Sequence, residues 1–225
     1  MAISNSGWTE VRAVFRKEAV SELRGRHGVV TSLLFAFMTV TALGVAAART
    51  SPTPSLAAGM LWAALLFAAI TGLVRTFVTE EDQGTGDLLR LWAKPGAVFW
   101  GKFLYNGALI VLVAAIVAPL FALFVGVSPH DWALAVAAIF VGCVALAAAI
   151  SLCGALVARA EGHGALAGVI SIPVLLPVVF LGVGALRIAF GEPGTSGWVS
   201  VAGLVGLGAA FVAAGPYLFA AVWKQ

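Results

Sequence analysis

Residues 103–127 read FLYNGALIVLVAAIVAPLFALFVGV, a run without a charged side chain. A helix of this length, at about 1.5 Å per residue, spans the roughly 30 Å hydrocarbon core of a bilayer. The apolar residues do not alternate with polar ones, as they would along a strand of a membrane β-barrel. A helix also satisfies its backbone hydrogen bonds internally, which is necessary in lipid because water is absent. The run therefore predicts a transmembrane α-helix.

Similar apolar runs on both sides of this one predict a polytopic membrane protein of the all-α class. The chain is 61% hydrophobic and only 10% charged, whereas soluble domains carry roughly 25% charged residues. Such a composition leaves too little polar surface for a water-soluble fold, so the bilayer is the solvent that suits it. We predict six transmembrane helices, at Gly28–Ala48, Leu56–Val74, Phe103–Val127, Trp132–Val157, Ala165–Leu186 and Trp198–Val222.

The distribution of basic residues predicts the orientation of these spans. If the amino terminus is cytoplasmic, Arg49 and Arg187 are the only Lys or Arg residues in the outer loops. All the others then fall on the inner side, as the positive-inside rule requires. We therefore expect both termini in the cytoplasm. The same placement, beside apolar segments in short loops, argues against nucleic-acid binding.

Residues 1–27 are predicted to form a cytoplasmic interfacial amphipathic helix ahead of the transmembrane domain, residues 28–225. Apolar side chains recur every three or four residues from Trp8 through Phe15 to Leu23. Basic side chains between them suit anionic lipid headgroups. The alternative is a basic juxtamembrane segment that only fixes the topology. The predicted membrane-interface residues are Trp8, Phe15, Arg16, Lys17 and Arg24.

Small residues spaced four apart in two spans predict close contacts between helices. Small side chains let helix backbones approach each other in lipid, where the hydrophobic effect does not drive association. One ladder lies in the fourth span and the other in the sixth. They are Cys143, Ala147, Ser151 and Ala155, and Ala202, Gly206, Ala210 and Ala214.

The sequence offers no arrangement typical of catalysis or of metal binding. No span carries Asp, Glu or Lys near its middle, which argues against an ion-coupled or proton-coupled transporter. His27, His130 and His163 are too scattered to form a metal or haem site on one helix. The phosphate-binding pattern GxxxxGK[ST] is absent, so ATP is not expected to bind by that route. We predict no catalytic residue, no metal site and no directly bound cofactor.

A polar segment between the second and third spans, residues 76–102, lies on the predicted cytoplasmic side. Within it, residues 79–95 read TEEDQGTGDLLRLWAKP. Thr85 can cap a short helix that carries Asp87 in its first turn and that Pro95 ends. Large apolar side chains give this helix a face that suits either a groove on a partner or the membrane surface. These side chains are Leu88, Leu89, Leu91 and Trp92.

Two prolines are expected to interrupt the fifth span. Pro173 and Pro177 each lack a backbone donor and each clash with the preceding helical turn. Because they lie four residues apart, they share one face of the helix. Membrane helices commonly bend at such kinks during conformational change, and the alternative is a static kink that only aids packing.

The loop resembles the coupling element of type-2 ABC exporter permeases, and the whole chain resembles the CcmB family, haem exporter protein B. The resemblance rests on the acidic residues, the Gly-Thr pair, the Leu-Leu pair and the proline within residues 80–95. It extends to RKE at residues 16–18 and TSLLFA at residues 31–36. The chain departs from the family pattern at Gly86, where leucine is usual, and at residues 92–94. We predict nine ATPase-coupling residues, of which the resemblance implies all but Trp92, which is taken from the apolar face of the helix. They are Glu80, Glu81, Gly84, Thr85, Asp87, Leu88, Leu89, Trp92 and Pro95.

This resemblance implies a permease subunit, with the type-2 ABC exporter fold, of an ABC transporter complex for cytochrome c biogenesis. ATP hydrolysis is expected on a separate CcmA-type ATPase, and the complex is expected to include a second copy of the chain with CcmC-type and CcmD-type membrane subunits. The complex would handle haem, either by exporting it to the periplasm or by ATP-driven release of the haem-loaded chaperone CcmE. The expected location is the bacterial inner membrane.

Two other functions stay open at this point. One is a type-2 ABC permease that exports another substrate, such as a lipid, a polysaccharide or a drug. The other is a membrane scaffold protein that transports nothing. Neighbouring genes would separate the two permease functions, and stimulation of a co-purified ATPase would separate both from a scaffold.

Overall fold

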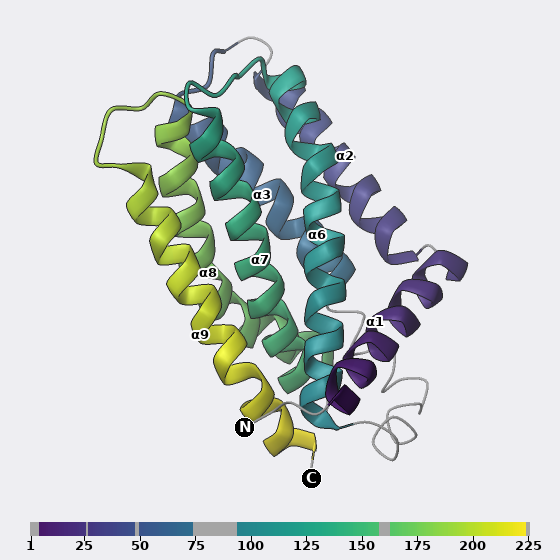
Figure 1. Ribbon diagram of the computed structural model, residues 1–225. Coiled ribbons are helices and arrows are strands. Elements are labelled where there is room, and N and C mark those ends of the chain that lie inside the picture. Colours follow the sequence, from purple (N-terminus) through teal and green to yellow (C-terminus); the bar gives the residue numbers. More distant parts are fainter. Residues whose placement is uncertain (1–4, 26, 48–49, 74–93, 158–162, 224–225) are drawn as a thin grey trace.

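The computed structural model describes residues 5–25, 27–47, 50–73, 94–157 and 163–223. Within these ranges the ordered elements are helices, and six of them are long and apolar enough to cross a membrane. The prediction of a polytopic all-α membrane protein is therefore confirmed (Figure 1). The helices are α1 (Asn5–Gly25), α2 (His27–Ala47), α3 (Pro54–Leu73), α6 (Pro95–Val125), α7 (Trp132–Val157), α8 (His163–Ala189) and α9 (Gly197–Trp223).

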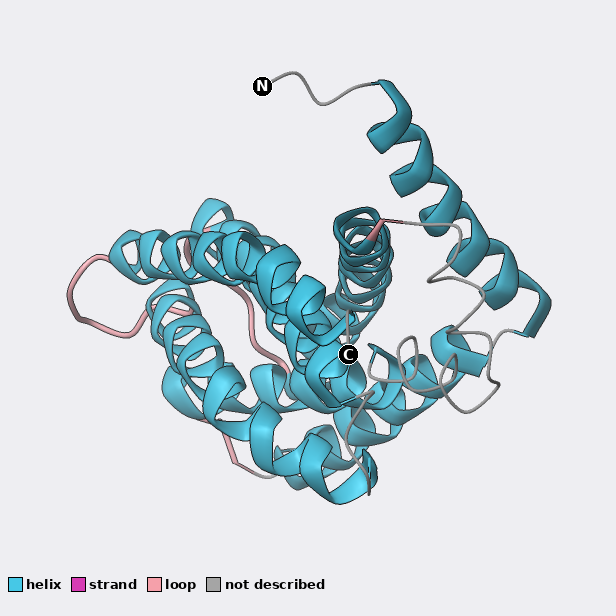
Figure 2. Cartoon of the chain, turned by 90° about the horizontal axis from the view of Figure 1, so that it is seen from below, coloured by secondary structure: helices cyan, strands magenta, loops and turns pink. Residues whose placement is uncertain are grey.

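The six membrane helices run alternately up and down in a single bundle (Figure 1). α1 lies beside the lower part of α6, at the end where α6 begins and α9 finishes, and we call this end of the bundle the α1 end. α7 occupies the middle of the bundle, where it packs against α6, α8 and α9. Seen from the α1 end, α1 lies at the edge of the bundle (Figure 2).

The third membrane helix starts earlier than the sequence predicts. α6 begins at Pro95 rather than at Phe103, so residues 95–102 belong to a helix and not to the cytoplasmic loop. Proline is favoured in the first helical turn, where its missing N–H has no partner to lose. The charge of Lys102 suggests a loop, but its side chain is only 1% exposed. The other five predicted spans agree with the observed helices to within a few residues.

The connection between α6 and α7 is short because both helices end in well-defined caps. Gly126 adopts a left-handed conformation with φ 73°, which closes the carboxyl end of α6, and its N–H donates to the Ala122 carbonyl oxygen. The Asp131 carboxylate accepts a hydrogen bond from the Leu134 N–H at 2.9 Å and so caps the start of α7. Together these caps hold α6 and α7 antiparallel.

The core of the bundle is organised around one tryptophan. Trp62 of α3 is fully buried, and its indole fits against Gly142 of α7 and Gly182 of α8. A Cβ at either glycine would overlap the ring atoms. Among the described residues, the indole N–H has no hydrogen-bond partner. Shape rather than polarity therefore fixes the contact among α3, α7 and α8.

Of the two small-residue ladders, the described part of the one in α7 is buried between helices and the one in α9 is largely exposed. In α7, Cys143, Ala147 and Ser151 are fully buried against neighbouring helices, as the sequence predicts. In α9, Ala202 and Gly206 are exposed on the surface of the chain. The spacing alone does not distinguish the two ladders, because a small side chain suits both a helix contact and a lipid-facing surface.

The prolines of the fifth membrane helix do not end it, which corrects the prediction that they interrupt the span. α8 continues from His163 to Ala189 through both Pro173 and Pro177. Both prolines are exposed on the surface of the bundle. Membrane helices tolerate proline because neighbouring groups and local adjustments satisfy the freed carbonyl groups. A kink at these prolines, whether static or a hinge, stays a prediction.

Glu192, in the connection between α8 and α9, bonds to two helices at the end of the bundle opposite α1. Its carboxylate accepts hydrogen bonds from the Ser55 hydroxyl of α3 and from the Arg187 guanidinium of α8, the latter at 2.6 Å. The Ser55 hydrogen bond, followed by the interactions with Arg187, lowers the pKa of Glu192, while burial opposes this. The carboxylate thus joins the α8–α9 connection to the start of α3.

We expect this tie to weaken in acid. Because the folded-state pKa of Glu192 lies below its unfolded value of about 4.3, the stabilisation is present above that pH and is lost as the pH falls through the folded pKa. Thermal unfolding in detergent should show Glu192→Gln melting below the unsubstituted protein near neutral pH, with the gap closing in acid. Asp131→Asn is the control, because asparagine also caps helices. A gap for Glu192→Gln that persists in acid would contradict this account.

Candidate functional site

The ends of α3 and α6 at the α1 end flank the segment predicted to couple to an ATPase. α3 finishes at Leu73 and α6 starts at Pro95. Pro95 is therefore the first residue of a membrane helix, in addition to any role in ending the preceding segment. The other predicted coupling residues lie outside the described residues, so their helix stays a prediction. They are Glu80, Glu81, Gly84, Thr85, Asp87, Leu88, Leu89 and Trp92.

Aromatic side chains anchor the first turns of α6 to α9. Phe99 is fully buried, and its ring centroid lies 6.3 Å from that of Phe219. The ring also lies directly over Gly215, where a Cβ would overlap it. Trp100 stacks edge-on against Phe103, with ring centroids 5.7 Å apart. A displacement at Pro95 would therefore act on a well-packed helix end.

α1 approaches α6 most closely at Gly101. A Cβ at this glycine would come within 2.6 Å of the Val14 side chain and within 3.1 Å of the Val11 carbonyl oxygen. Val11 and Val14 are both buried. Only glycine leaves room for the two helix backbones at this distance, so Gly101 sets the contact between α1 and α6.

The next residue on α6 forms a buried ion pair with α1. The Lys102 ammonium lies 3.2 Å from the Glu18 carboxylate, and Lys102 is 1% exposed while Glu18 is 8% exposed. Lys17 lies 3.2 Å from the same carboxylate oxygen from the more exposed side. Burial lowers the pKa of Lys17, Glu18 opposes this, and the charge of Lys102 adds to the lowering. A buried charge is costly unless it is paired, so Glu18 and Lys102 depend on each other.

A second glutamate of α1 contacts two helices. The Glu22 carboxylate accepts a hydrogen bond from the Val29 N–H of α2 at 2.8 Å, and the Tyr105 hydroxyl of α6 donates to it as well. The Phe15 ring packs edge-on against Tyr105, with centroids 6.4 Å apart. These contacts hold α1 at a fixed angle to both α2 and α6.

The charges of α1 are separated between its two faces. Glu18 and Glu22 point to the protein, whereas Arg12, Arg16 and Arg24 are exposed on the other side. Exposed apolar side chains lie among these arginines, as on a helix that binds a membrane surface. They are Trp8, Val20 and Leu23.

The position of the buried face corrects one detail of the sequence analysis. The predicted apolar face runs through Trp8 and Leu23, but these are 58% and 73% exposed. Val11 of that face is buried, and the surface that packs on the protein also contains Val14 and Glu18. Of the other predicted interface residues, Phe15 is half-buried against Tyr105, and Arg16, Lys17 and Arg24 are exposed. Their contact with lipid stays a prediction.

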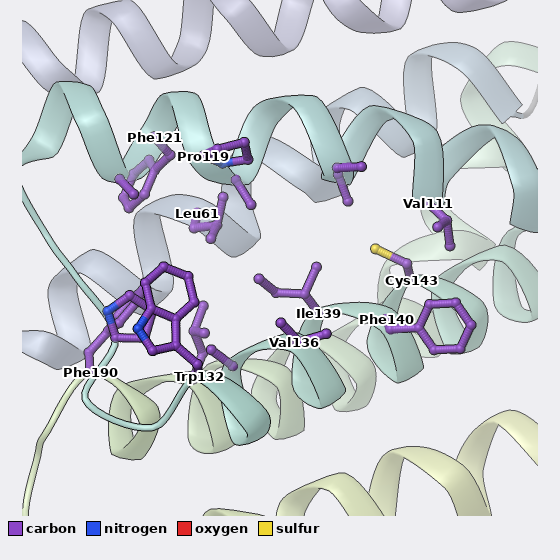
Figure 3. Close-up of a pocket in the computed structure, with 17 residues that line it drawn as sticks. Leu61, Val111, Pro119, Phe121, Trp132, Val136, Ile139, Phe140, Cys143 and Phe190 are labelled. Atoms are coloured by element: carbon purple, nitrogen blue, oxygen red, sulfur yellow. The ribbon is translucent and has the colours of Figure 1, made fainter.

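An elongated apolar cavity of about 490 Å³ lies between α6 and α7 (Figure 3). Trp132 and Phe190 lie at one end, and Val111 and Cys143 lie at the other. None of the 17 described residues that line it is charged, and none is a histidine. The cavity therefore suits a hydrocarbon chain better than a charged or metal-ligated molecule.

Comparison with known families decides the identity of the chain. A family model described as CcmB protein matches residues 9–224, which is nearly the whole chain. The chain belongs to the CcmB family. A search of the curated proteins finds no match. CcmB proteins are the membrane permease component of the haem-export ABC system of cytochrome c maturation, so the function implied by the resemblance is confirmed.

This CcmB-family chain is a multi-pass permease and is not itself an enzyme. The family works with an ABC ATPase and with other Ccm subunits. In the described residues no group of three or more His, Cys, Asp or Glu side chains could hold a metal ion.

Sequence reasoning did not find the ion pair between α1 and α6 of this CcmB-family chain. Lys102 reads as a loop residue because it follows a polar segment, and Glu18 reads as one of several charges on a basic helix. A signal was present only for the neighbouring contact: Glu22 falls within the predicted apolar arc of the first helix, and a carboxylate there needs a partner in the protein.

Proposed function

We propose that this CcmB-family chain couples ATP hydrolysis on a separate CcmA-type subunit to a conformational change of its membrane helices. The observation that carries the proposal is the start of α6. Residues 80–95 lead directly into this helix at Pro95, and its first turns are packed on α9 and on α1. A subunit that binds residues 80–95 would therefore act next to a helix whose first turns are packed in the bundle.

The proposed docking element combines charge and apolar surface. Glu80, Glu81 and Asp82 would meet basic residues of the ATPase, while Leu88, Leu89 and Trp92 would fill an apolar pocket on it. Burying one large apolar side chain is worth roughly 1.5–3 kcal/mol. Closure of two ATPase subunits would then move this element, together with α3 and α6. No catalytic residue is required in the permease.

The proposal places the α1 end in the cytoplasm of a bacterium, with the chain in the inner membrane. The support is the distribution of Lys and Arg, which collect at that end in the sequence pattern. A second copy of the chain, CcmC-type and CcmD-type subunits, and indirectly the haem chaperone CcmE, would complete the assembly.

We further propose that haem is handled by the complex rather than held in the cavity of this chain. Haem needs an axial ligand for its iron, usually His, Cys, Met or Tyr, and cationic partners for its propionates. Among the described lining residues, Cys143 alone offers a soft donor, and no cationic side chain is present. ATP binds on the partner subunit in this account.

Leu89→Asp tests the docking element. The substitution places a charge in the apolar face of residues 80–95, so the ATPase should leave the membrane fraction while the permease inserts normally. Membrane fractions from cells that express both subunits are probed for each of them. Gln83→Asp adds the same charge next to the acidic end and should leave the ATPase bound. An ATPase that stays bound and active with Leu89→Asp would rule out this docking site.

A further inference from the structure

We propose that the buried Glu18–Lys102 pair is a positioning device that makes α1 and the first turns of α6 one rigid unit in ATP-driven coupling. The inference rests on the proposed function, because it concerns what happens after an ATPase displaces residues 80–95. Glu18 and Lys102 are positioning residues here, and they touch neither ATP nor haem.

Stability alone does not account for a buried ion pair at this position. Removing two charges from water is expensive, and well-packed apolar residues of similar size often hold two helices as well or better. What the pair adds is selectivity for one arrangement. If α1 slid or rotated, it would leave the 1%-exposed Lys102 without the Glu18 carboxylate that lies 3.2 Å away. Ionisable side chains within membrane helices are rare, face the protein interior and usually mark a function.

The surrounding contacts restrict α1 in other directions. Because Gly101 has no Cβ, the α1 backbone can approach α6 closely around Val14. Any other residue at position 101 would clash with the Val14 side chain. Glu22 holds the start of α2 through the Val29 N–H and also bonds to Tyr105. With the helix fixed at three places along its length, a movement of α6 must carry α1 with it.

The Glu18–Lys102 pair lies close to Pro95, where a displacement of residues 80–95 by the ATPase would reach α6. Lys102 follows Pro95 by two helical turns, or roughly 10 Å at 1.5 Å per residue. A helix transmits displacement over this distance with little loss, because its backbone hydrogen bonds are continuous. The exposed face of α1, with Arg12, Arg16 and Arg24, would then move relative to the lipid headgroups.

A charge swap tests this role. Glu18→Lys, Lys102→Glu and the double exchange are each expressed with the ATPase and the other subunits of the complex. Three quantities are measured: the amount of ATPase bound to the permease, the rate of ATP hydrolysis, and the yield of mature cytochrome c. Each single exchange should leave the ATPase bound but lower the cytochrome yield per ATP hydrolysed at least tenfold. The double exchange should restore the yield to within about threefold.

Glycine substitutions on the same helix provide a matched comparison. Gly101→Ala introduces a methyl group against Val14 and should reduce the yield per ATP, as the single exchanges do. Gly96→Ala, five residues earlier on α6, meets open space and should leave the yield per ATP unchanged.

Three results would overturn the inference: single exchanges with normal coupling, a double exchange that restores nothing, or single exchanges that lose the ATPase altogether. Failure of the proposed function would be seen separately, as an ATPase that stays bound and active with Leu89→Asp.

Discussion

Gly142→Ala is expected to lower the free energy of unfolding by about 3 kcal/mol, the upper end of the usual cost of overpacking. The added methyl group would overlap the outer ring of the Trp62 indole. The indole cannot move aside, because Gly182 confines it in the same way from α8. Protein interiors at this density do not absorb a methyl group without strain. Thermal unfolding in detergent, followed by loss of the monodisperse peak, measures the effect.

A second substitution checks the cause. Trp62→Phe removes the outer ring atoms that the new methyl group would meet and also an N–H without a described partner. Combined with Gly142→Ala, it should recover most of the lost stability. Gly59→Ala, on the same helix as Trp62 and facing open space, is the control. If Gly142→Ala alone left the melting temperature unchanged, the contact would not exist as described.

Gly215→Ala is expected to have the second largest effect, a loss of about 2 kcal/mol, within the range for overpacked sites. The new methyl group would overlap the tip of the Phe99 ring, which lies between α6 and α9. Phe99 is also close to Pro95, so the substitution should reduce ATP-coupled activity as well as stability. The melting temperature and the yield of mature cytochrome c per ATP hydrolysed are the two measurements.

The matched control for this prediction lies on the same helix. Gly206→Ala faces open space and should change neither measurement. Phe99→Leu shortens the side chain by the atoms that would overlap and should rescue Gly215→Ala in part. Equal losses from Gly206→Ala and Gly215→Ala would show that helix flexibility, and not the Phe99 contact, is responsible.

The sequence predicts the number and the type of the membrane helices because lipid leaves so few alternatives. A long apolar run can only be a helix there, and this holds for all six spans. The family is also recognisable from short motifs spread along the chain, and the match to residues 9–224 confirms it.

Contacts between distant residues are what the sequence does not reveal. The third span includes Lys102 because the Glu18 carboxylate of α1 pairs with its buried charge, and hydropathy cannot anticipate a partner on another helix. Gly142 and Gly182 matter because the Trp62 indole packs against both, yet nothing in the sequence distinguishes them from the other glycines among the 26. In contrast, the ladder of α7 is found correctly because Cys143, Ala147 and Ser151 lie on the side of that helix that packs against its neighbours.

The junction between α1 and α6 also constrains how the protein is made. Glu18 leaves the ribosome long before Lys102, and two membrane helices must be inserted between them. Until α6 is in place, Glu18 lacks the Lys102 ammonium and Glu22 lacks the Tyr105 hydroxyl, so burying the inward face of α1 would be costly. The contacts between α1 and α6 can therefore form only after α2 and α3 have been synthesised.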